Sequence, residues 1–279
     1  MKKLGLIAGG GALPVEIAEH CRRSGRPLFV IRLKGFADTE LEPYAGAEVG
    51  IAELGKCFKA LKRAGCESVC LVGNVSRPDF AALIPDLRGL AVLPSAIAAA
   101  RKGDDALLRL MLGEFEKEGF AVEGANEVMD DLSLGSGPLG RVAPSDEEMA
   151  DVHRALDVAR AIGRLDVGQG AVVCRGLVLA VEAQEGTDAM LARVADLPVA
   201  LRGQPGASAG VLAKAPKPIQ ETRIDLPTIG PTTIHAVARA GLAGIVGEAG
   251  GLLVLDREAV IELADELGVF ILGVEPAGP

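Results

Sequence analysis

The sequence predicts an α/β protein of two domains, the first with a mainly parallel, Rossmann-like sheet. The chain has 279 residues, which suits two domains at about 100–200 residues each. Hydrophobic residues make up 49% and charged residues 24%, the balance of a globular protein with a sizeable core. In the first third, short apolar runs alternate with helical patterns of about 10–15 residues. This alternation is typical of parallel strands joined by helices.

The elements of the first third follow one another in a regular order. A turn of three glycines, residues 9–11, separates the first strand from a helix in which Pro14 suits the first turn. Further on, apolar side chains recur at helical spacing, as between Leu107 and Phe115. The predicted strands are Leu4–Ala8, Leu28–Leu33 and Ser68–Val72, and the predicted helices are Pro14–Ser24, Gly55–Ala64 and 81–119.

A change of composition marks the domain boundary. Residues 133–144 are rich in small and turn-forming residues, so we expect them to link a nucleotide-binding domain, 1–132, to a catalytic domain, 145–279. Ser145 followed by Glu148 predicts a capping box at the start of a helix that ends near Ile162. The other predicted elements of the second domain are the strands Ala171–Cys174, Leu177–Val181, 211–214, 244–246, 252–255 and 269–273, the first two joined by a tight hairpin at Arg175-Gly176, and the helices 187–197, 231–241 and 257–267.

Charge and composition exclude several classes of protein. The net charge of −9 and the 3% of aromatic residues argue against nucleic-acid binding, which needs clustered cations and stacking side chains. No apolar run reaches the ~18–20 residues that span a bilayer, and we expect no signal peptide. Five cysteines without a C-x-x-C pair predict buried thiols, including Cys66 and Cys70, in a reducing cytoplasm.

Two glycine-rich motifs resemble nucleotide-binding fingerprints without matching them. The turn at residues 9–11 precedes a helix, the context in which backbone N–H groups hold a phosphate. Pro14 stands where the dinucleotide motif needs its third glycine, and Arg32 ends the next strand in place of an acid, so NAD is not expected. A phosphate-binding turn and a purely structural turn both stay open. Residues 50–56 match G-x-x-x-x-G-K, but Cys57 replaces the Mg²⁺-binding hydroxyl, which argues against a P-loop.

Two further polar loops follow predicted strands, where ligands bind in open α/β sheets. In residues 73–78, Asn74 has the hydrogen-bonding capacity for a uracil or amide edge, and Arg77 for a phosphate. Residues 182–188 gather several polar side chains. Thr187 or Asp188 as a helix cap explains part of that cluster, and a metal or ligand site is the alternative.

The stretch from residue 214 to residue 233 carries the strongest functional signal. It is long, has little periodicity and leads into a helix that begins near Thr232. Long loops of this kind in compact domains are usually functional or disordered, and the apolar residues and prolines among its charges argue against disorder. Its charged residues are cations suited to phosphates and carboxylates suited to a divalent ion, namely Lys214, Lys217, Glu221, Arg223 and Asp225.

At these four segments the chain resembles the LpxI family. The matching stretches are Gly-Leu-Ile-Ala-Gly-Gly-Gly-Ala-Leu-Pro, Gly-Asn-Val-Ser-Arg-Pro, Val-Glu-Ala-Gln-Glu-Gly-Thr-Asp-Ala-Met and Lys-Ala-Pro-Lys-Pro-Ile-Gln-Glu-Thr-Arg-Ile-Asp-Leu-Pro-Thr-Ile-Gly. The resemblance spans essentially the whole chain, and the four segments occur in the family's order.

The resemblance implies a UDP-2,3-diacylglucosamine pyrophosphatase of lipid A biosynthesis. Such an enzyme uses Mg²⁺ or another divalent cation, and water attacks the α-phosphorus of the UDP moiety. The products are UMP and 2,3-diacylglucosamine 1-phosphate, known as lipid X. The resemblance further implies that the two α/β domains enclose the substrate in a cleft between them, and that Asp225 is essential, either as a metal ligand or by orienting the water.

Residues and resemblance together give a set of candidate site residues. We expect catalytic roles for Asp225, Lys214 and Arg223, and metal ligation by Asp225, Glu221 and Asp188. The expected substrate-binding residues are Gly11, Ala12, Leu13, Asn74, Val75, Arg77, Gln169, Thr187, Asp188, Lys217, Thr232 and Thr233.

The acyl chains of the implied substrate also suggest contact with the membrane. Two long chains would hold the substrate in a bilayer at about 0.8 kcal/mol per CH₂. We therefore expect peripheral membrane contact at the inner face of the inner membrane, with an apolar groove in the helices of residues 81–112 or in the interdomain cleft. Ordinary core packing of those helices is the alternative. A homodimer is left open, as is a non-catalytic nucleotide-sugar sensor that uses the same loops.

Overall fold

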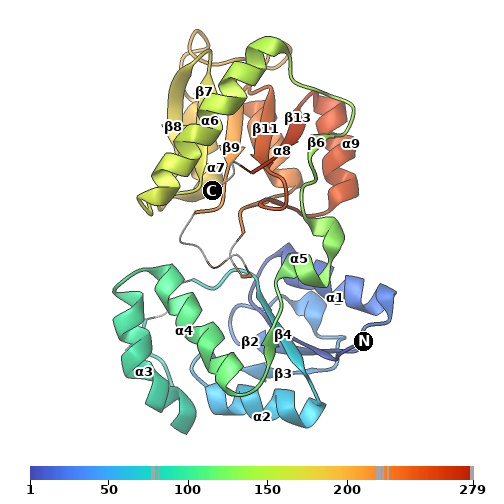
Figure 1. Ribbon diagram of the computed structural model, residues 1–279, viewed down its shortest axis with the longest axis vertical. Coiled ribbons are helices and arrows are strands. Elements are labelled where there is room, and N and C mark those ends of the chain that lie inside the picture. Colours follow the sequence, from blue (N-terminus) through green and yellow to red (C-terminus); the bar gives the residue numbers. More distant parts are fainter. Residues whose placement is uncertain (77–78, 81, 218–220, 222, 225, 277–279) are drawn as a thin grey trace. The chain divides into compact units, whose positions relative to one another are not determined.

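The computed structural model describes residues 1–279 except 77–78, 81, 218–220, 222, 225 and 277–279. The chain divides into two compact units, Met1–Asp130 and Asp131–Pro279. Each unit has its own sheet, flanked by helices (Figure 1). The predicted two-domain α/β class is therefore confirmed. None of the helices in the described part of the chain has the length and apolar character needed to cross a bilayer.

The first unit is built on a parallel sheet. Its strand order is β3-β2-β1-β4-β5, and every pairing between the described strands is parallel. Parallel pairing needs long crossover connections, which here contain α-helices except between β2 and β3, where the connection holds only the short helix η1. The elements are β1 (Leu4–Ala8), α1 (Ala12–Ser24), β2 (Leu28–Leu33), η1 (Thr39–Leu41), β3 (Gly46–Val49), α2 (Leu54–Ala64), β4 (Ser68–Val72), α3 (Leu87–Ala100), α4 (Asp104–Lys117), β5 (Ala121–Val122) and α5 (Ala125–Val128).

The structure corrects two sequence predictions in this unit. The helical stretch predicted over 81–119 is two helices, α3 and α4, because the chain breaks at Gly103, whose φ of 133° is unfavourable for other residues. The strand β3 was not predicted, because it is a short edge strand that includes Gly46 and the exposed Glu48. The strands β1, β2 and β4 have the predicted bounds.

A single carboxylate orders the helices α2 and α3. Asp86 accepts hydrogen bonds from the backbone N–H of Gly89 in α3 at 2.8 Å and of Lys56 in α2 at 2.8 Å. Partial burial opposes ionisation of Asp86, but these and other backbone hydrogen bonds outweigh it and hold its pKa below the ordinary value. The start of α3 is thereby fixed against α2.

The second unit contains a mixed sheet of strand order β6-β13-β11-β9-β7-β8. The strands β9, β11 and β13 run parallel, and β6, β7 and β8 add antiparallel pairs at its two ends. The elements are η2 (Asp130–Leu132), β6 (Gly137–Leu139), α6 (Asp146–Arg164), β7 (Gly170–Cys174), β8 (Leu177–Val181), α7 (Gly186–Ala195), β9 (Val211–Lys214), β10 (Thr228–Ile229), α8 (Pro231–Arg239), β11 (Gly244–Glu248), β12 (Leu253–Val254), α9 (Arg257–Leu267) and β13 (Phe270–Val274).

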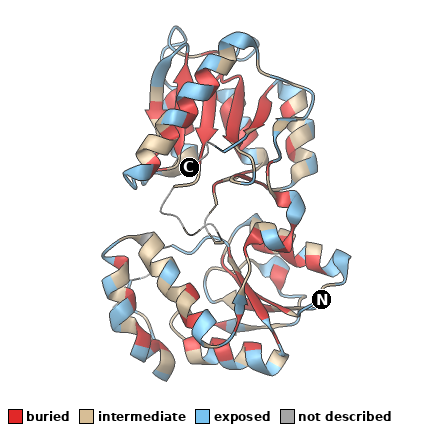
Figure 2. Ribbon diagram, in the orientation of Figure 1, coloured by how far each residue is buried: buried red, intermediate tan, exposed pale blue. Residues whose placement is uncertain are grey.

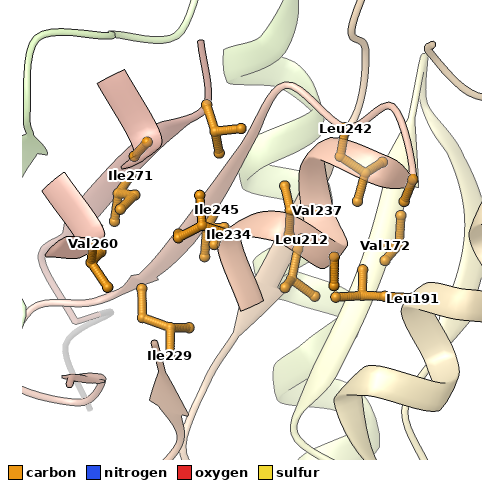
Figure 3. Close-up of a cluster of buried hydrophobic side chains, with 14 of the residues drawn as sticks. Val172, Leu191, Leu212, Ile229, Ile234, Val237, Leu242, Ile245, Val260 and Ile271 are labelled. Atoms are coloured by element: carbon orange, nitrogen blue, oxygen red, sulfur yellow. The ribbon is translucent and has the colours of Figure 1, made fainter. Parts of the chain in front are cut away.

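Both faces of this sheet are buried against helices. Along β9, Leu212 packs into the cluster with α7, α8 and α9, whereas Val211 and Ala213 pack into the cluster with α6. This alternation is the two-residue period of a strand. Figure 2 shows the resulting buried strands, and Figure 3 shows the cluster that contains Leu212, Val237 and Ile245. The central strands are held on both faces, which fixes the positions of their carboxyl ends.

The stretch expected to be a linker, 133–144, contributes to the second unit. It contains β6, which pairs with β13, and Leu134, which is buried. The predicted capping box is present, since Ser145 and Glu148 exchange hydrogen bonds at the start of α6.

The predicted hairpin turn joins β7 to β8. Both turn residues, Arg175 and Gly176, have positive φ, as in the tight turns that match the twist of hairpins. Their backbone N–H groups donate to the buried Asp151 of α6, each at 2.7 Å. This contact explains a buried carboxylate without a catalytic role.

Candidate functional site

The glycine turn of the first unit lies at the switch point of its sheet. From β1 the chain proceeds to β2 on one side, and β4 lies on the other side of β1. Ligands of open α/β sheets bind beyond the carboxyl ends of the strands at such a reversal. The two loops that leave this point are residues 9–11 after β1 and residues 73–76 after β4.

Backbone hydrogen bonds join these two loops. Gly10 and Asn74 exchange a pair of them, N–H to O, at 3.0 and 2.7 Å. Gly73 has a φ of 95°, and a Cβ atom there would lie 2.7 Å from Cγ of Pro14 and 2.8 Å from the carbonyl oxygen of Gly10. The close approach of the loops therefore requires glycine at position 73.

The predicted binding residues of the first unit gather around the start of α1. Gly11 precedes the helix with a φ of 94°, and the amide nitrogen of Asn74 lies 3.4 Å from where a Cβ of Gly11 would be. Gly11, Ala12, Asn74 and Val75 are exposed and Leu13 is half-buried, whereas Arg77 lies outside the described residues. The N-terminus of α1 carries partial positive charge, so this arrangement suits an anion flanked by an amide side chain.

Asp38 is a neighbour of this loop that the sequence reasoning did not single out. Its Oδ2 accepts a hydrogen bond from the backbone N–H of Gly11 at 2.6 Å. It lies five residues after the end of β2, beyond the position at which the dinucleotide motif places its acid, so the search at the strand end missed it.

The second unit gathers a buried polar network at the carboxyl end of β9. Lys214, the last residue of β9, is only 5% exposed. Its Nζ donates to Oγ1 of Thr187 at 2.9 Å and to the carbonyl oxygen of Thr228 at 3.1 Å. Thr187 in turn donates to Oε1 of Glu182 at 2.9 Å. The structure thus brings together two predicted site residues, Lys214 and Thr187, that are 27 positions apart.

Gln169 enters the same region through strand pairing. The next residue, Gly170, lies opposite Lys214 in the β7–β9 register, and the carbonyl oxygen of Gln169 accepts from the N–H of Ala215 at 2.9 Å. The side-chain Oε1 of Gln169 is buried and accepts no hydrogen bond within the described residues. An uncompensated buried acceptor is costly, so this oxygen is a candidate ligand contact.

The contact between Lys214 and Thr228 also closes the long loop. Residues 215–227 leave from β9 and return to β10, and the ammonium group of Lys214 holds the returning end. The strand β10 leads directly into α8. There Thr232 is exposed and Thr233 is buried, its hydroxyl accepting from the N–H of Gly230 at 3.4 Å.

The other predicted cations of the loop have carboxylate partners. Lys217 pairs with Asp166 at 2.8 Å. Arg223 donates to both oxygens of Glu221, at 2.9 and 3.1 Å. The charges of Lys217 and Arg223 are therefore partly neutralised.

The predicted metal ligands are not tested by the structure. Asp225 lies outside the described residues, Glu221 is engaged by Arg223, and Asp188 is exposed in the first turn of α7. Among the described residues, no group of three or more His, Cys, Asp or Glu side chains is placed to hold a metal ion.

The cysteines and the second glycine motif carry no chemistry. All five cysteines are free and buried, and burial raises the pKa of Cys57 to about 12 and that of Cys66 above its ordinary value. In the G-x-x-x-x-G-K motif, Glu53 accepts from the N–H of Gly50 at 2.7 Å and pairs with Lys56. The loop is satisfied by its own carboxylate, which leaves no cradle for a phosphate.

Fold and geometry define a class of protein: a two-unit α/β protein with a glycine turn at the switch point of one sheet and a buried lysine network in the other unit. Residues 3–132 match the LpxI N-terminal domain and residues 135–272 the LpxI C-terminal domain. The chain belongs to the LpxI family.

One relative matches the chain over nearly its full length. It is the UDP-2,3-diacylglucosamine pyrophosphatase LpxI of Caulobacter vibrioides, 71% identical over 276 residues, which are 99% of each chain. Among solved structures, the CobK precorrin-6A reductase is similar with a TM-score of 0.33 and 14% identity, over 100% of this chain and 90% of that one. The N5-carboxyaminoimidazole ribonucleotide synthetase from Thermotoga maritima has a TM-score of 0.26 and 11% identity, over 65% of this chain and 42% of that one. Likeness at this level carries no argument about function.

Proposed function

We propose that this protein hydrolyses UDP-2,3-diacylglucosamine at the pyrophosphate, giving UMP and 2,3-diacylglucosamine 1-phosphate in lipid A biosynthesis. The observation that carries the proposal is the 71% identity, over 99% of both chains, to a protein named for that pyrophosphatase activity. The described site supports it, because each unit presents groups suited to one part of a nucleotide-linked phosphate.

In this proposal the first unit binds the nucleotide. The backbone N–H groups of residues 9–11 and of Asn74 donate within the protein, so the groups available to a ligand are the amide of Asn74 and the first turn of α1. An amide both donates and accepts, which suits a uracil edge, and the helix N-terminus suits a phosphate.

The second unit holds the reacting phosphates. A protein with a net charge of −9 repels an anionic substrate unless local cations reverse the potential. Lys214 supplies such a cation in a buried setting, where its charge acts more strongly than in water. Arg223 and Lys217 add cations, and Asp225 orients the attacking water or holds the metal ion. The water attacks the α-phosphorus of the UDP moiety.

A divalent cation, Mg²⁺ in the first instance, belongs to the same proposal. Carboxylate oxygens are the ligands that Mg²⁺ prefers, and Asp225 and Asp188 supply that chemistry, whereas the carboxylate of Glu221 is committed to Arg223. When bound, the ion neutralises charge on the phosphates.

The experiment that tests the function is release of UMP from UDP-2,3-diacylglucosamine by the purified protein, with Mg²⁺ and with EDTA. We expect UMP and the sugar 1-phosphate in equal amounts with Mg²⁺ and none with EDTA. In H₂¹⁸O the label should appear in UMP, because the α-phosphorus is attacked. Binding of the substrate without turnover, whatever the metal, would identify a nucleotide-sugar sensor instead. Label found only in the sugar phosphate would contradict the assigned site of attack.

We further propose that α3 contacts the membrane in which a diacylated substrate resides, on the cytoplasmic face. Ile84, Leu87 and Leu90 are 86%, 89% and 56% exposed. The outward side of the helix continues with small, mostly apolar residues as far as Ala98, and the exposed cations Arg101 and Lys102 follow. An exposed apolar helix face flanked by cations is typical of contact with an anionic bilayer. Figure 2 shows exposed residues along α3.

Replacing Leu87 and Leu90 together by glutamine should weaken binding to vesicles of phosphatidylglycerol and phosphatidylethanolamine. Burying one leucine side chain is worth about 1.5–3 kcal/mol, so we expect the partition coefficient in a sedimentation assay to fall about tenfold or more. The matched control replaces Leu165 and Leu177, which are exposed on the second unit, by glutamine. An equal loss in both variants would contradict a role for α3.

A further inference from the structure

Glu182 is a buried carboxylate beside the lysine network, and it is not among the candidate catalytic, substrate-binding or metal-binding residues given above. It follows directly after β8 and is 6% exposed. Its Oε1 accepts the hydrogen bond of the Thr187 hydroxyl at 2.9 Å. Thr187 is also the residue to which Lys214 donates, so the three side chains form one hydrogen-bonded chain.

The chemistry of these groups fixes the direction of that chain. An ammonium group can only donate, and a carboxylate can only accept. The single hydrogen of the Thr187 hydroxyl must therefore point to Glu182, and an oxygen lone pair must face Lys214. Without the carboxylate, the hydroxyl is free to rotate its hydrogen toward other acceptors, and Lys214 loses a fixed partner.

The second carboxylate oxygen of Glu182, Oε2, lies directly against the backbone at Gly170. A Cβ atom on Gly170 would lie 2.6 Å from Oε2, so the absence of a side chain at position 170 leaves room for it. Oε2 is buried and accepts no hydrogen bond within the described residues. A buried carboxylate that is only half satisfied costs stability, and a neutral side chain would anchor α7 at lower cost.

We propose that Glu182 is a positioning residue, which orients the Thr187 hydroxyl and through it holds Lys214 for the reaction. The inference rests on the proposed hydrolysis and adds to it a residue that does not touch the substrate. Loss of the carboxylate should act mainly on kcat, because a misplaced cation stabilises the developing charge of the transition state less well.

The test is a double-mutant cycle of Glu182→Leu and Thr187→Val, with kcat and KM for UDP-2,3-diacylglucosamine and the dissociation constant of UMP as readouts. Leucine removes the acceptor, whereas the amide oxygen of a glutamine would still accept from the Thr187 hydroxyl. We expect Glu182→Leu to lower kcat about 30-fold, with KM within about threefold of wild type. In the Thr187→Val background the same change should cost less than about threefold, because the carboxylate acts through the hydroxyl. The matched control is Glu114→Leu, at a buried carboxylate of the first unit that pairs with Arg88 and Lys117, and it should leave kcat unchanged.

Gly170→Ala is a second variant that tests the placement of Glu182. The new methyl group displaces the flexible end of Glu182 and leaves the carboxylate chemically intact, so the protein should fold and kcat should fall about tenfold. Independent, multiplying effects of Glu182→Leu and Thr187→Val would overturn the proposal, as would normal activity of Gly170→Ala. If wild type releases no UMP, the proposed hydrolysis fails. Glu182 is then judged by UMP affinity, where coupling to Thr187 supports its role and no coupling overturns it.

Discussion

Replacement of Lys214 by methionine should lower kcat for UMP release by about 10²–10³-fold and leave the protein folded. Lys214 is 5% exposed and its ammonium group donates to Thr187 and Thr228, so in the proposed reaction its charge would act on the phosphates with little screening by water. Loss of one such preorganised group typically costs about this factor. Methionine keeps the length and the apolar stem of lysine and removes the cost of burying an ammonium charge. Initial rates of UMP release by wild type and Lys214→Met measure the loss of activity, and their thermal unfolding shows whether the variant is folded.

The matched control for this variant is Lys62→Met. Lys62 pairs with Glu118 on the surface of the first unit, and its side chain is 52% exposed. Its replacement should leave kcat within about twofold of wild type. A Lys214→Met protein that retains more than a tenth of the wild-type kcat would contradict a catalytic role for the ammonium group. The sensor hypothesis predicts an effect on binding alone.

Most of the secondary structure could be predicted because the strands are short, mainly apolar runs. Leu28–Leu33 and Ser68–Val72 are such runs, bounded by turns and helices, and they have the bounds of β2 and β4. The strand β3 escaped prediction because it is short and half-exposed, and its pairing with β2 depends on tertiary structure rather than on its own residues. The break between α3 and α4 occurs at Gly103, which has a positive φ. It was not predicted, because the residues on both sides of Gly103 have helical periodicity.

The candidate site could be predicted residue by residue but not as an arrangement. Lys214 and Thr187 were each suspected from loops at strand ends, and their contact arises only when the end of β9 meets the start of α7. The cations Lys217 and Arg223 were expected to face phosphates. The sequence could not show that Asp166 and Glu221 compete for them.

Glu182 shows the opposite case, in which a residue was seen but not assigned. It lies in the polar loop of residues 182–188, for which the sequence leaves open both a helix cap at Thr187 or Asp188 and a metal or ligand site. Only the buried oxygen over Gly170 distinguishes the two.

The pairing of Glu221 with Arg223 gives the two loop carboxylates, Glu221 and Asp225, different expected roles. Both oxygens of Glu221 accept hydrogen bonds from one guanidinium group, a bidentate pair in which the carboxylate is already neutralised. Because Arg223 already neutralises its charge, Glu221 attracts a metal ion less strongly than it would without that pairing. We therefore expect Asp225, rather than Glu221, to hold the ion or to orient the water.

Asp225→Asn should accordingly lower kcat about 10³-fold or more, whereas Glu221→Gln should lower it by less than about tenfold. The first change removes the carboxylate charge that the proposal assigns to the reaction, and residues that act as a unit lose most of their effect when one member is removed. The second loosens Arg223 and leaves Asp225 in place. Rates of UMP release across a Mg²⁺ titration measure both. Glu221→Gln should keep the wild-type Mg²⁺ dependence, because its carboxylate is not a ligand. A Glu221→Gln protein that needs far more Mg²⁺ than wild type would reverse the assignment. A higher Mg²⁺ requirement is the result expected when a ligand of the ion is lost.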